Sequence, residues 1–211
     1  MHRETLQGFI VLEGIDGSGT TTQLGLLKTR LERSGVAYSL GCEPTTGPIG
    51  ALIRSALSGS FDARPETVAR LFVADRGEHL YGPDGIVERC ARGELVISDR
   101  YLFSSLVYQG LTCEPSLPER LNESFPLPEL VIFFELDPDT AAGRMGSRAS
   151  LEIYENLEFQ SQVAQRYRTV LSSFEEAGMK VVHIDAEARS EQVEEAVWKA
   201  IAPLANKVSR R

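Results

Sequence analysis

Residues 13–23, EGIDGSGTTTQ, combine closely spaced glycines with hydroxyl side chains, a composition that suits the binding of phosphate groups. The spacing Gly14-x-x-x-x-Gly19, followed by Thr20 and Thr21, matches a phosphate-binding loop, except that Thr20 stands where that motif carries lysine. Glycines let several backbone N–H groups converge on one anion, and a helix N-terminus adds the positive end of its dipole. The stretch indicates a nucleotide enzyme that works without its lysine, a protein that has lost its chemistry, or a chance run of glycines.

A second stretch, ELVISDRYLFSSLVYQG, ends an apolar run with Asp99, Arg100 and Tyr101. Arginine can hold a phosphate through two parallel hydrogen bonds, and aspartate can hold Mg²⁺ directly or through water. In the first stretch, Thr21 occupies the position whose hydroxyl coordinates Mg²⁺ in phosphate-binding loops. We predict Thr21 and Asp99 as the metal-binding residues; the alternative for Asp99 and Arg100 is an ordinary surface ion pair at a strand end.

The elements that must position these residues follow from the alternation of short apolar runs with longer amphipathic segments. Because strands buried on both faces are uniformly apolar, the pattern predicts an α/β fold with a parallel sheet of about five strands flanked by helices. Ligands of such sheets bind at the carboxyl ends of the strands. The predicted strands are Gly8–Glu13, Val36–Leu40, Leu95–Ser98, Leu130–Leu136 and Lys180–Ile184. The predicted helices lie near Thr21–Ser34, Gly47–Ser58, Pro65–Tyr81, Gly85–Arg92, Leu151–Ala177 and Ser190–Leu204.

The bulk properties exclude several classes of protein. A chain of 211 residues fits a single domain, 1–211, with a core of its own. A formal net charge of -8 argues against nucleic acid or an anionic membrane as the main partner. The three cysteines, Cys42, Cys90 and Cys113, are widely spaced, which favours reduced thiols and a cytoplasmic location. No signal-peptide core and no membrane-spanning run are visible in the sequence.

Taken together, the motifs resemble the thymidylate kinases, which transfer the γ-phosphate of ATP to dTMP. The matching segments are FIVLEGIDGSG, LFVADRGEHL (71–80), ISDRYLFSSLVYQG, the strand Val131–Leu136 and LEF (157–159). They follow one another in the family's order and cover most of the chain. The resemblance implies a P-loop NTPase-type fold with a short lid, Mg²⁺ as cofactor, and a homodimer. Its implied ATP contacts are Gly14, Ile15, Asp16, Gly17, Ser18, Gly19, Thr20, Thr21 and Thr22.

The resemblance also implies an acceptor site. Its residues are Asp16, Arg54, Phe72, Arg76, Arg100, Ser105, Tyr108 and Gln109. In the family, Asp16 would meet the sugar 3′-hydroxyl, while Arg100 would hold the acceptor phosphate. Phe72 would stack on thymine, and Arg76 would donate to a base carbonyl, as an aromatic ring and a cationic donor suit these groups.

Other acceptor assignments are weaker or open to a structural explanation. Ser105 would lie by the base edge and Tyr108 would crowd the sugar 2′ position, favouring deoxyribose. Arg54 is a weaker assignment to a phosphate contact. Structural alternatives remain for several of these residues: Phe72 as a core residue, Arg76 in a surface pair with Glu78 or Asp75, and Ser105 and Tyr108 in helix packing.

A lid is expected at about residues 143–150, by the same resemblance. Arg144 and Arg148 lie one helical turn apart there and could stabilise the transferring phosphoryl group as an arginine finger does. The alternative is two solvated arginines on a mobile loop. The predicted catalytic set is Asp99, Arg100, Arg144 and Arg148, with Glu13 and Asp16 assisting through water.

Two departures from the family pattern fall at phosphate-contacting positions. Thr20 replaces the loop lysine, and Cys42 stands where related chains usually carry arginine. The lysines of the chain are Lys28, Lys180, Lys199 and Lys207, all expected far from the loop, so compensation would have to come from arginine.

The predicted function is transfer of a phosphoryl group from ATP to dTMP, giving dTDP for dTTP synthesis. Because the acceptor residues are intact and the donor side is weakened, one alternative is a catalytically impaired nucleotide-binding protein. A sister kinase with another acceptor, such as dUMP, is the other alternative, and an engineered Thr20 in an ordinary kinase is a further explanation of the missing lysine.

Overall fold

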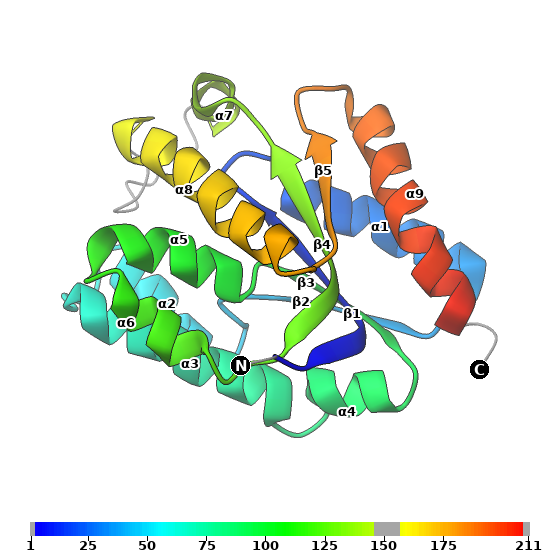
Figure 1. Cartoon of the computed structure of the whole chain (residues 1–211), viewed down its shortest axis with the longest axis horizontal. Helices are drawn as coiled ribbons and strands as arrows, with labels where there is room; N and C mark the ends of the chain where they lie inside the picture. Colours follow the sequence, from blue (N-terminus) through cyan, green and yellow to red (C-terminus); the bar gives the residue numbers. More distant parts are fainter. Residues whose placement is uncertain (1–2, 146–156, 209–211) are drawn as a thin grey trace.

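The fold of this chain is taken from a computed structural model that describes residues 3–145 and 157–208. Its sheet has five parallel strands in the order β2-β3-β1-β4-β5 (Figure 1). The strands are β1 (Thr5–Gly14), β2 (Tyr38–Cys42), β3 (Leu95–Asp99), β4 (Leu127–Glu135) and β5 (Val181–Asp185). The predicted α/β class of P-loop NTPase type, with about five parallel strands, is confirmed.

Helices lie on both sides of this sheet. In Figure 1, α1 and α9 lie to one side, and α8, α5 and α3 lie to the other. The described helices are α1 (Thr20–Ser34), α2 (Pro48–Leu57), α3 (Pro65–Tyr81), α4 (Ile86–Ala91), α5 (Leu102–Thr112), α6 (Ser116–Asn122), α7 (Pro138–Met145), α8 (Leu157–Glu176) and α9 (Ser190–Val208). Within the described ranges, none of them is long and apolar enough to cross a membrane.

The core explains why the strands could be read from sequence. The central strand β1 buries Phe9, Ile10, Val11 and Leu12 completely, because helices cover both of its faces. Its neighbour β4 is also buried along most of its length. A strand of this kind has no polar side, so an uninterrupted apolar run marks it.

Several predicted boundaries needed correction. Strand β2 lies two residues later than predicted, since it pairs with β3 in a register that sets Cys42 opposite Asp99. The predicted helix 151–177 is described from Leu157 onward. Helices α5, α6 and α7 were not predicted. Helix α5 is buried from Leu102 to Gly110, so it lacks the polar stripe by which an amphipathic helix is recognised.

The carboxyl edge of the sheet brings the two chemical stretches together. Strand β1 leads into the glycine loop before α1, and β3 leads through Arg100 into α5. In the parallel register Leu12 pairs with Asp99, and the Arg100 amide donates to the Leu12 carbonyl at 2.8 Å. The glycine loop and the Asp-Arg-Tyr turn are therefore neighbours.

Candidate functional site

The glycine loop has the geometry of an anion cradle. Gly17 and Gly19 adopt φ angles of 82° and 90°, which residues with side chains rarely adopt. A Cβ at Gly14 would collide with Ser18 Oγ. Helix α1 starts at Thr20 without a side-chain cap and without an acidic residue in its first turn. The N-terminal amides of α1 and its dipole are thus available to an anion.

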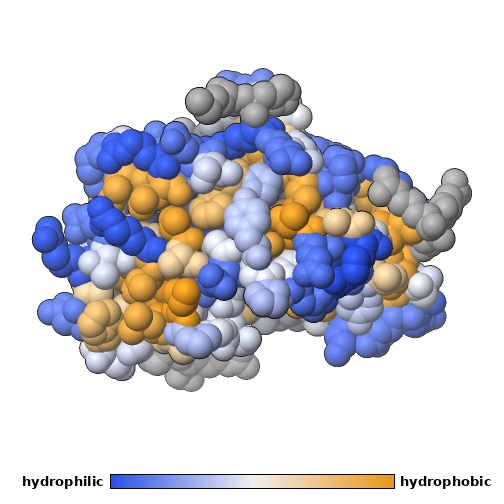
Figure 2. Space-filling model, turned by 90° about the horizontal axis from the view of Figure 1, so that it is seen from below, coloured by the Kyte–Doolittle hydropathy of each residue, from blue (hydrophilic) through white to orange (hydrophobic). Residues whose placement is uncertain are grey.

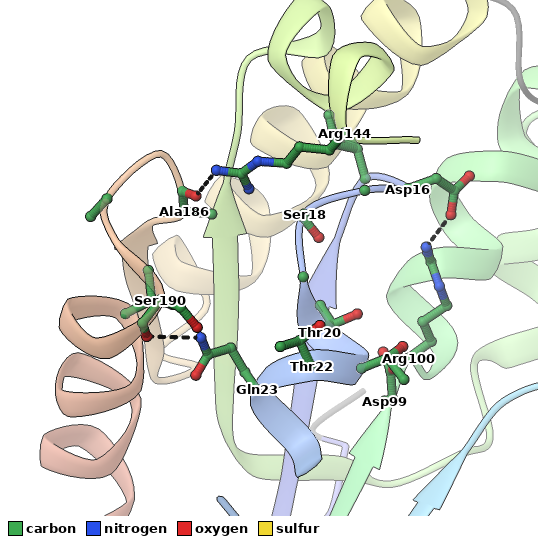
Figure 3. Close-up of a pocket in the computed structure, with 16 residues that line it drawn as sticks. Asp16, Ser18, Thr20, Thr22, Gln23, Asp99, Arg100, Arg144, Ala186 and Ser190 are labelled. Carbon is green, nitrogen blue, oxygen red and sulfur yellow. Dashed lines mark hydrogen bonds and ion pairs between the residues drawn. The ribbon is translucent and has the colours of Figure 1, made fainter. Parts of the chain in front are cut away.

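A cleft of about 590 Å³ opens over this loop (Figure 3). That volume is within the usual range for a small-molecule or cofactor site. All the predicted ATP contacts from Ile15 to Thr22 line it, together with Asp99, Arg100 and Arg144; Gly14 ends β1 and does not. The opposite wall comes from the segment after β5 and the start of α9.

Thr21 and Asp99 meet at the floor of this cleft. Thr21 Oγ1 donates to Asp99 Oδ2 at 2.7 Å. Asp99 Oδ1 is buried and has no hydrogen-bond partner within the part of the chain that the structure describes. Oxygen ligands of this kind suit Mg²⁺, which binds through one or two protein oxygens plus substrate phosphates and water. The residues fit the predicted metal site.

Arg100 stands between this cleft and a second one. Its backbone has a φ of 72°, and its Nη2 donates to Asp16 Oδ1 at 2.5 Å. Its Nη1 lies 3.3 Å from both Ser104 Oγ and Tyr167 Oη, and 3.5 Å from Tyr108 Oη. The guanidinium also lies over the Tyr108 ring, 5.4 Å from its centroid. The arginine is held from several sides while remaining at a cleft wall.

The second cleft, of about 150 Å³, contains much of the predicted acceptor site. Asp16 and Arg100 line this cleft and the first one, so the two share a wall. Phe72, Tyr108 and Gln109 line the second cleft alone. Tyr108 Oη donates to Asp16 Oδ2 at 3.2 Å, which ties the α5 side of the cleft to the glycine loop. The other residues that line the second cleft are Glu43, Pro44, Leu57 and Ser104.

Arg76 lies behind this cleft and does not line it. Its side chain is fully buried, and Glu43 Oε2 accepts from both Nε at 3.0 Å and Nη2 at 2.7 Å. Ser105 and Asn122 accept further hydrogen bonds from the guanidinium. The alternative of a surface pair with Asp75 or Glu78 is wrong, because the partner is a buried carboxylate from the turn after β2.

Arg54 and Cys42 are engaged by the turn that follows β2. Arg54 donates to the carbonyls of Pro44 at 3.0 Å and Thr45 at 2.6 Å. Cys42 Sγ lies 3.5 Å from the Pro44 carbonyl oxygen. Neither residue lines one of the two clefts. The structure therefore places Arg54 beside the second cleft rather than in it.

Arg144 lies in the last turn of α7, so the first residues of the predicted lid, 143–145, belong to a helix. Its Nη2 donates to the Ala186 carbonyl at 2.8 Å, on the side of the cleft away from Arg100 (Figure 3). Arg148 and the rest of the predicted lid, 146–150, lie outside the described residues.

Three residues of the site were missed or misread in the sequence. Gln160 Nε2, from α8, donates to Asp16 Oδ2 at 3.0 Å; its place after the LEF segment was the available signal. Tyr167, also from α8, donates to Glu13 at 2.9 Å. Glu13 is fully buried and lines neither cleft, so protein groups rather than water surround its carboxylate. Burial raises the pKa of Glu13 to about 7, against the opposing hydrogen bond from Ser104.

The arrangement offers a cradle for a polyphosphate, oxygen ligands for a divalent cation, and an arginine between two clefts. Such a site can hold two ligands so that a phosphate of one faces a phosphate of the other. Phosphoryl transfer between two such ligands needs no covalent intermediate on the protein, since positioning and charge stabilisation are enough.

Comparison with known proteins agrees with this chemistry. The model of the thymidylate kinase family matches residues 12–197. A putative thymidylate kinase of Treponema pallidum is 40% identical over 196 residues, covering 91% of this chain and 93% of that protein. A putative thymidylate kinase of Aeropyrum pernix is 37% identical over 178 residues, covering 83% and 84%. A probable thymidylate kinase of Pyrobaculum aerophilum is 40% identical over 187 residues, covering 88% and 91%.

Proposed function

Because the chain belongs to the thymidylate kinase family, we propose that it transfers the γ-phosphoryl group of ATP to dTMP, forming dTDP. The observation that carries this proposal is the wall shared by the two clefts. Asp16 and Arg100 line both, so ligands in the larger and the smaller cleft would meet at these residues. Direct transfer requires the donor and acceptor phosphates to be brought together in this way.

ATP is the donor in the larger cleft. The amides of the glycine loop, from Gly17 to Thr21, bind its β-phosphate at the start of α1. Thr21 and Asp99 hold Mg²⁺, which, when bound, neutralises charge on the phosphates. Arg144 contributes positive charge from α7 at the outer side of the cleft.

dTMP is the acceptor in the smaller cleft. Arg100 binds its phosphate, Phe72 stacks on the base, and the Gln109 carboxamide offers a donor and an acceptor to the base edge. Asp16 and Tyr108, which are hydrogen bonded to each other, face the sugar. Arg76 supports this cleft from behind, through Glu43 and Ser105.

The substitution of the loop lysine by Thr20 weakens the donor side. Among the described residues that line the larger cleft, only Arg100 and Arg144 carry positive charge. This observation favours a second candidate function, a protein that binds both nucleotides but transfers phosphate slowly. The two candidates differ in turnover and not in ligand identity.

We also propose a homodimer. Figure 2 shows apolar side chains gathered on parts of one face of the molecule. Separately, Leu52 in α2 and Phe61 in the turn after it are among the most exposed large apolar side chains, at 42% and 40%. Apolar side chains that gather on one face, as in Figure 2, are the feature that marks an interaction surface. Light scattering of purified protein tests it, and a monomer at micromolar concentration would contradict it.

A coupled assay of ADP formation tests the kinase proposal. We expect turnover with Mg·ATP and dTMP, and much slower turnover with UMP or AMP as acceptor. Arg100→Ala should abolish most of the activity, since it removes the acceptor phosphate contact. Binding of dTMP and ATP without ADP formation would favour the slow or inactive candidate, and binding of neither would reject both.

A further inference from the structure

Glu13 is the centre of a buried hydrogen-bond network beneath the site. Its Oε1 accepts from the backbone amides of Tyr101 at 2.9 Å and Ser104 at 3.3 Å. Its Oε2 accepts from Ser104 Oγ at 2.7 Å and Tyr167 Oη at 2.9 Å. The carboxylate thus joins β1 to the start of α5 and to α8. A buried carboxylate with this many donors is costly to lose and fixes the groups that bond to it.

The network caps the helix that follows Arg100. Helix α5 begins after Tyr101, and no side chain of its own first residues caps it. Glu13 supplies the cap from β1 by accepting the amides of Tyr101 and Ser104. The turn immediately before it holds Arg100 at a φ of 72°, which is unfavourable for arginine. Such a backbone persists when its surroundings fix it.

The positions of the protons in this network decide whether the hydroxyl groups beside Arg100 accept hydrogen bonds from it or point their own protons toward it. When Glu13 is ionised, above its pKa, its carboxylate can only accept, so it draws the hydroxyl protons of Ser104 and Tyr167 toward itself. The two hydroxyls lie 2.8 Å apart, and this pull takes their protons away from that mutual contact. Both oxygens therefore present lone pairs to Arg100 Nη1, which lies 3.3 Å from each. The guanidinium is held by acceptors on this side and by Asp16 on the other.

We propose that Glu13 is the positioning residue of Arg100: through Ser104 and Tyr167 it sets the guanidinium in the orientation that binds the acceptor phosphate. The inference rests on the proposed function, in which Arg100 is the phosphate ligand. Glu13 lines neither cleft, so it acts through its neighbours and does not touch a substrate.

The test compares dTMP with thymidine, which has the same base and sugar but no phosphate. Glu13→Gln keeps the size of the side chain but adds an amide donor, which turns the hydroxyl protons toward Arg100. We expect the Kd for dTMP to rise about tenfold, the effect of disturbing a charged hydrogen bond, and the Kd for thymidine to change by less than about twofold. Titration calorimetry at pH 8, above the pKa of about 7 to which burial raises Glu13, measures both.

Two further variants make the result specific. Tyr167→Phe removes one lone pair from Arg100 and should show the same phosphate-specific loss, smaller in size. Tyr101→Phe removes a buried hydroxyl of the same turn, which donates to the Pro126 carbonyl at 3.0 Å, but leaves the Glu13 contacts intact. It should bind dTMP and thymidine as the unchanged protein does.

The outcomes separate this inference from the proposed function. Failure of the unchanged protein to bind dTMP would reject the proposed acceptor. Normal binding by the unchanged protein, with equal losses of dTMP and thymidine in Glu13→Gln, would overturn the positioning role and leave a structural one. If thermal unfolding shows that Glu13→Gln does not fold, Tyr167→Phe decides: unaltered affinity for dTMP in that variant would also overturn the inference.

Discussion

Thr21 Oγ1 donates a 2.7 Å hydrogen bond to Asp99 Oδ2, so the first turn of α1 is joined to the end of β3 across the floor of the larger cleft. The two residues are 78 positions apart in sequence, and the parallel order of β1 and β3 brings them together. The other oxygen of Asp99 has no partner among the described residues, so it is free to bind a ligand, and mutation of this pair tests that role.

Loss of either member of this pair should change the dependence on Mg²⁺. Thr21→Ala removes one of the two side chains proposed to bind Mg²⁺, and we expect the Mg²⁺ concentration at half-maximal rate to rise several-fold. Asp99→Asn removes the charge and should lower kcat by about 10²–10³, comparable to losing a group aimed at transition-state charge. ADP formation measured across a magnesium series checks both. Thr169→Ala, an exposed hydroxyl loss on α8, is the matched control, and a similar response in that variant would remove Thr21 from the site.

Introducing a cation into the glycine loop should accelerate transfer. Thr20 lines the larger cleft, so Thr20→Lys places an ammonium beside the phosphates. We expect kcat with dTMP to rise about tenfold or more, while the KM for ATP changes less, because a lysine at this position would act on transition-state charge. The same coupled assay measures both constants.

Gly25→Lys is the control for that experiment. Gly25 is exposed on the same helix, and an added side chain there meets no neighbouring atoms within 4 Å. This variant should leave kcat unchanged. If Thr20→Lys were no faster than the unchanged protein while Arg144→Ala were much slower, the arginine would already fill the role of the lysine.

Removal of the Arg76 side chain should lower the free energy of unfolding. Arg76→Ala leaves the Glu43 carboxylate buried without its guanidinium, and breaking such a pair costs about 3–5 kcal/mol. Urea denaturation measures the change in the free energy of unfolding. The double variant Glu43→Gln with Arg76→Met removes both charges and should recover much of the loss. If the single and double variants were equally stable, the unpaired buried charge of Glu43 would not be the cause of the instability of Arg76→Ala.

The free energy of unfolding should fall as pH rises through the range in which Glu13 titrates. Burial raises the pKa of Glu13 to about 7 in the folded chain, despite opposing hydrogen bonds from Ser104, Tyr167 and the Tyr101 amide and the charge of Arg100. Between about pH 4.5 and pH 7 the folded chain retains a proton that the unfolded chain has lost. Stability is therefore lost with rising pH, by up to roughly 3 kcal/mol at and above pH 7.

Urea unfolding at pH 5 and pH 8 tests this dependence. Glu13→Gln cannot titrate at this position, so its stability should depend less steeply on pH than that of the unchanged protein. The difference between the two curves removes every contribution to the pH dependence that the two proteins share. Parallel curves would mean that Glu13 is already ionised, or already protonated, throughout this range.

The sheet and the glycine loop could be predicted because their signals are local. The buried strands are continuous apolar runs, and the loop motif occupies consecutive positions. Arg76 shows the limit of such signals. Its acidic sequence neighbours, Asp75 and Glu78, suggested a surface pair, whereas the partner is Glu43, 33 positions away. Nothing in the local pattern indicates which carboxylate the fold will place beside a buried guanidinium.

The hydrogen-bond network around Glu13 could not be predicted from the sequence, for the same reason. Its partners come from 88 to 154 positions away, on α5 and α8. Helix α5 was itself not predicted, because it is buried on nearly every side and shows no amphipathic period. Sequence motifs indicated many of the residues that line the clefts, but Arg54, Arg76 and Ser105, which were also predicted to contact a ligand, line neither. The residues that hold the cleft walls in place follow from the tertiary packing.

Helix α5 packs against the core on one side and lines the smaller cleft on the other. These two roles limit the substitutions that the helix can accept during evolution. A substitution that widens the acceptor cleft from α5 also leaves a void in the interior, so a gain in substrate range would come with a loss of stability. Phe72, on α3, is only partly buried. We expect acceptor preference to diverge in natural lineages through positions such as Phe72, and the buried face of α5 to change slowly.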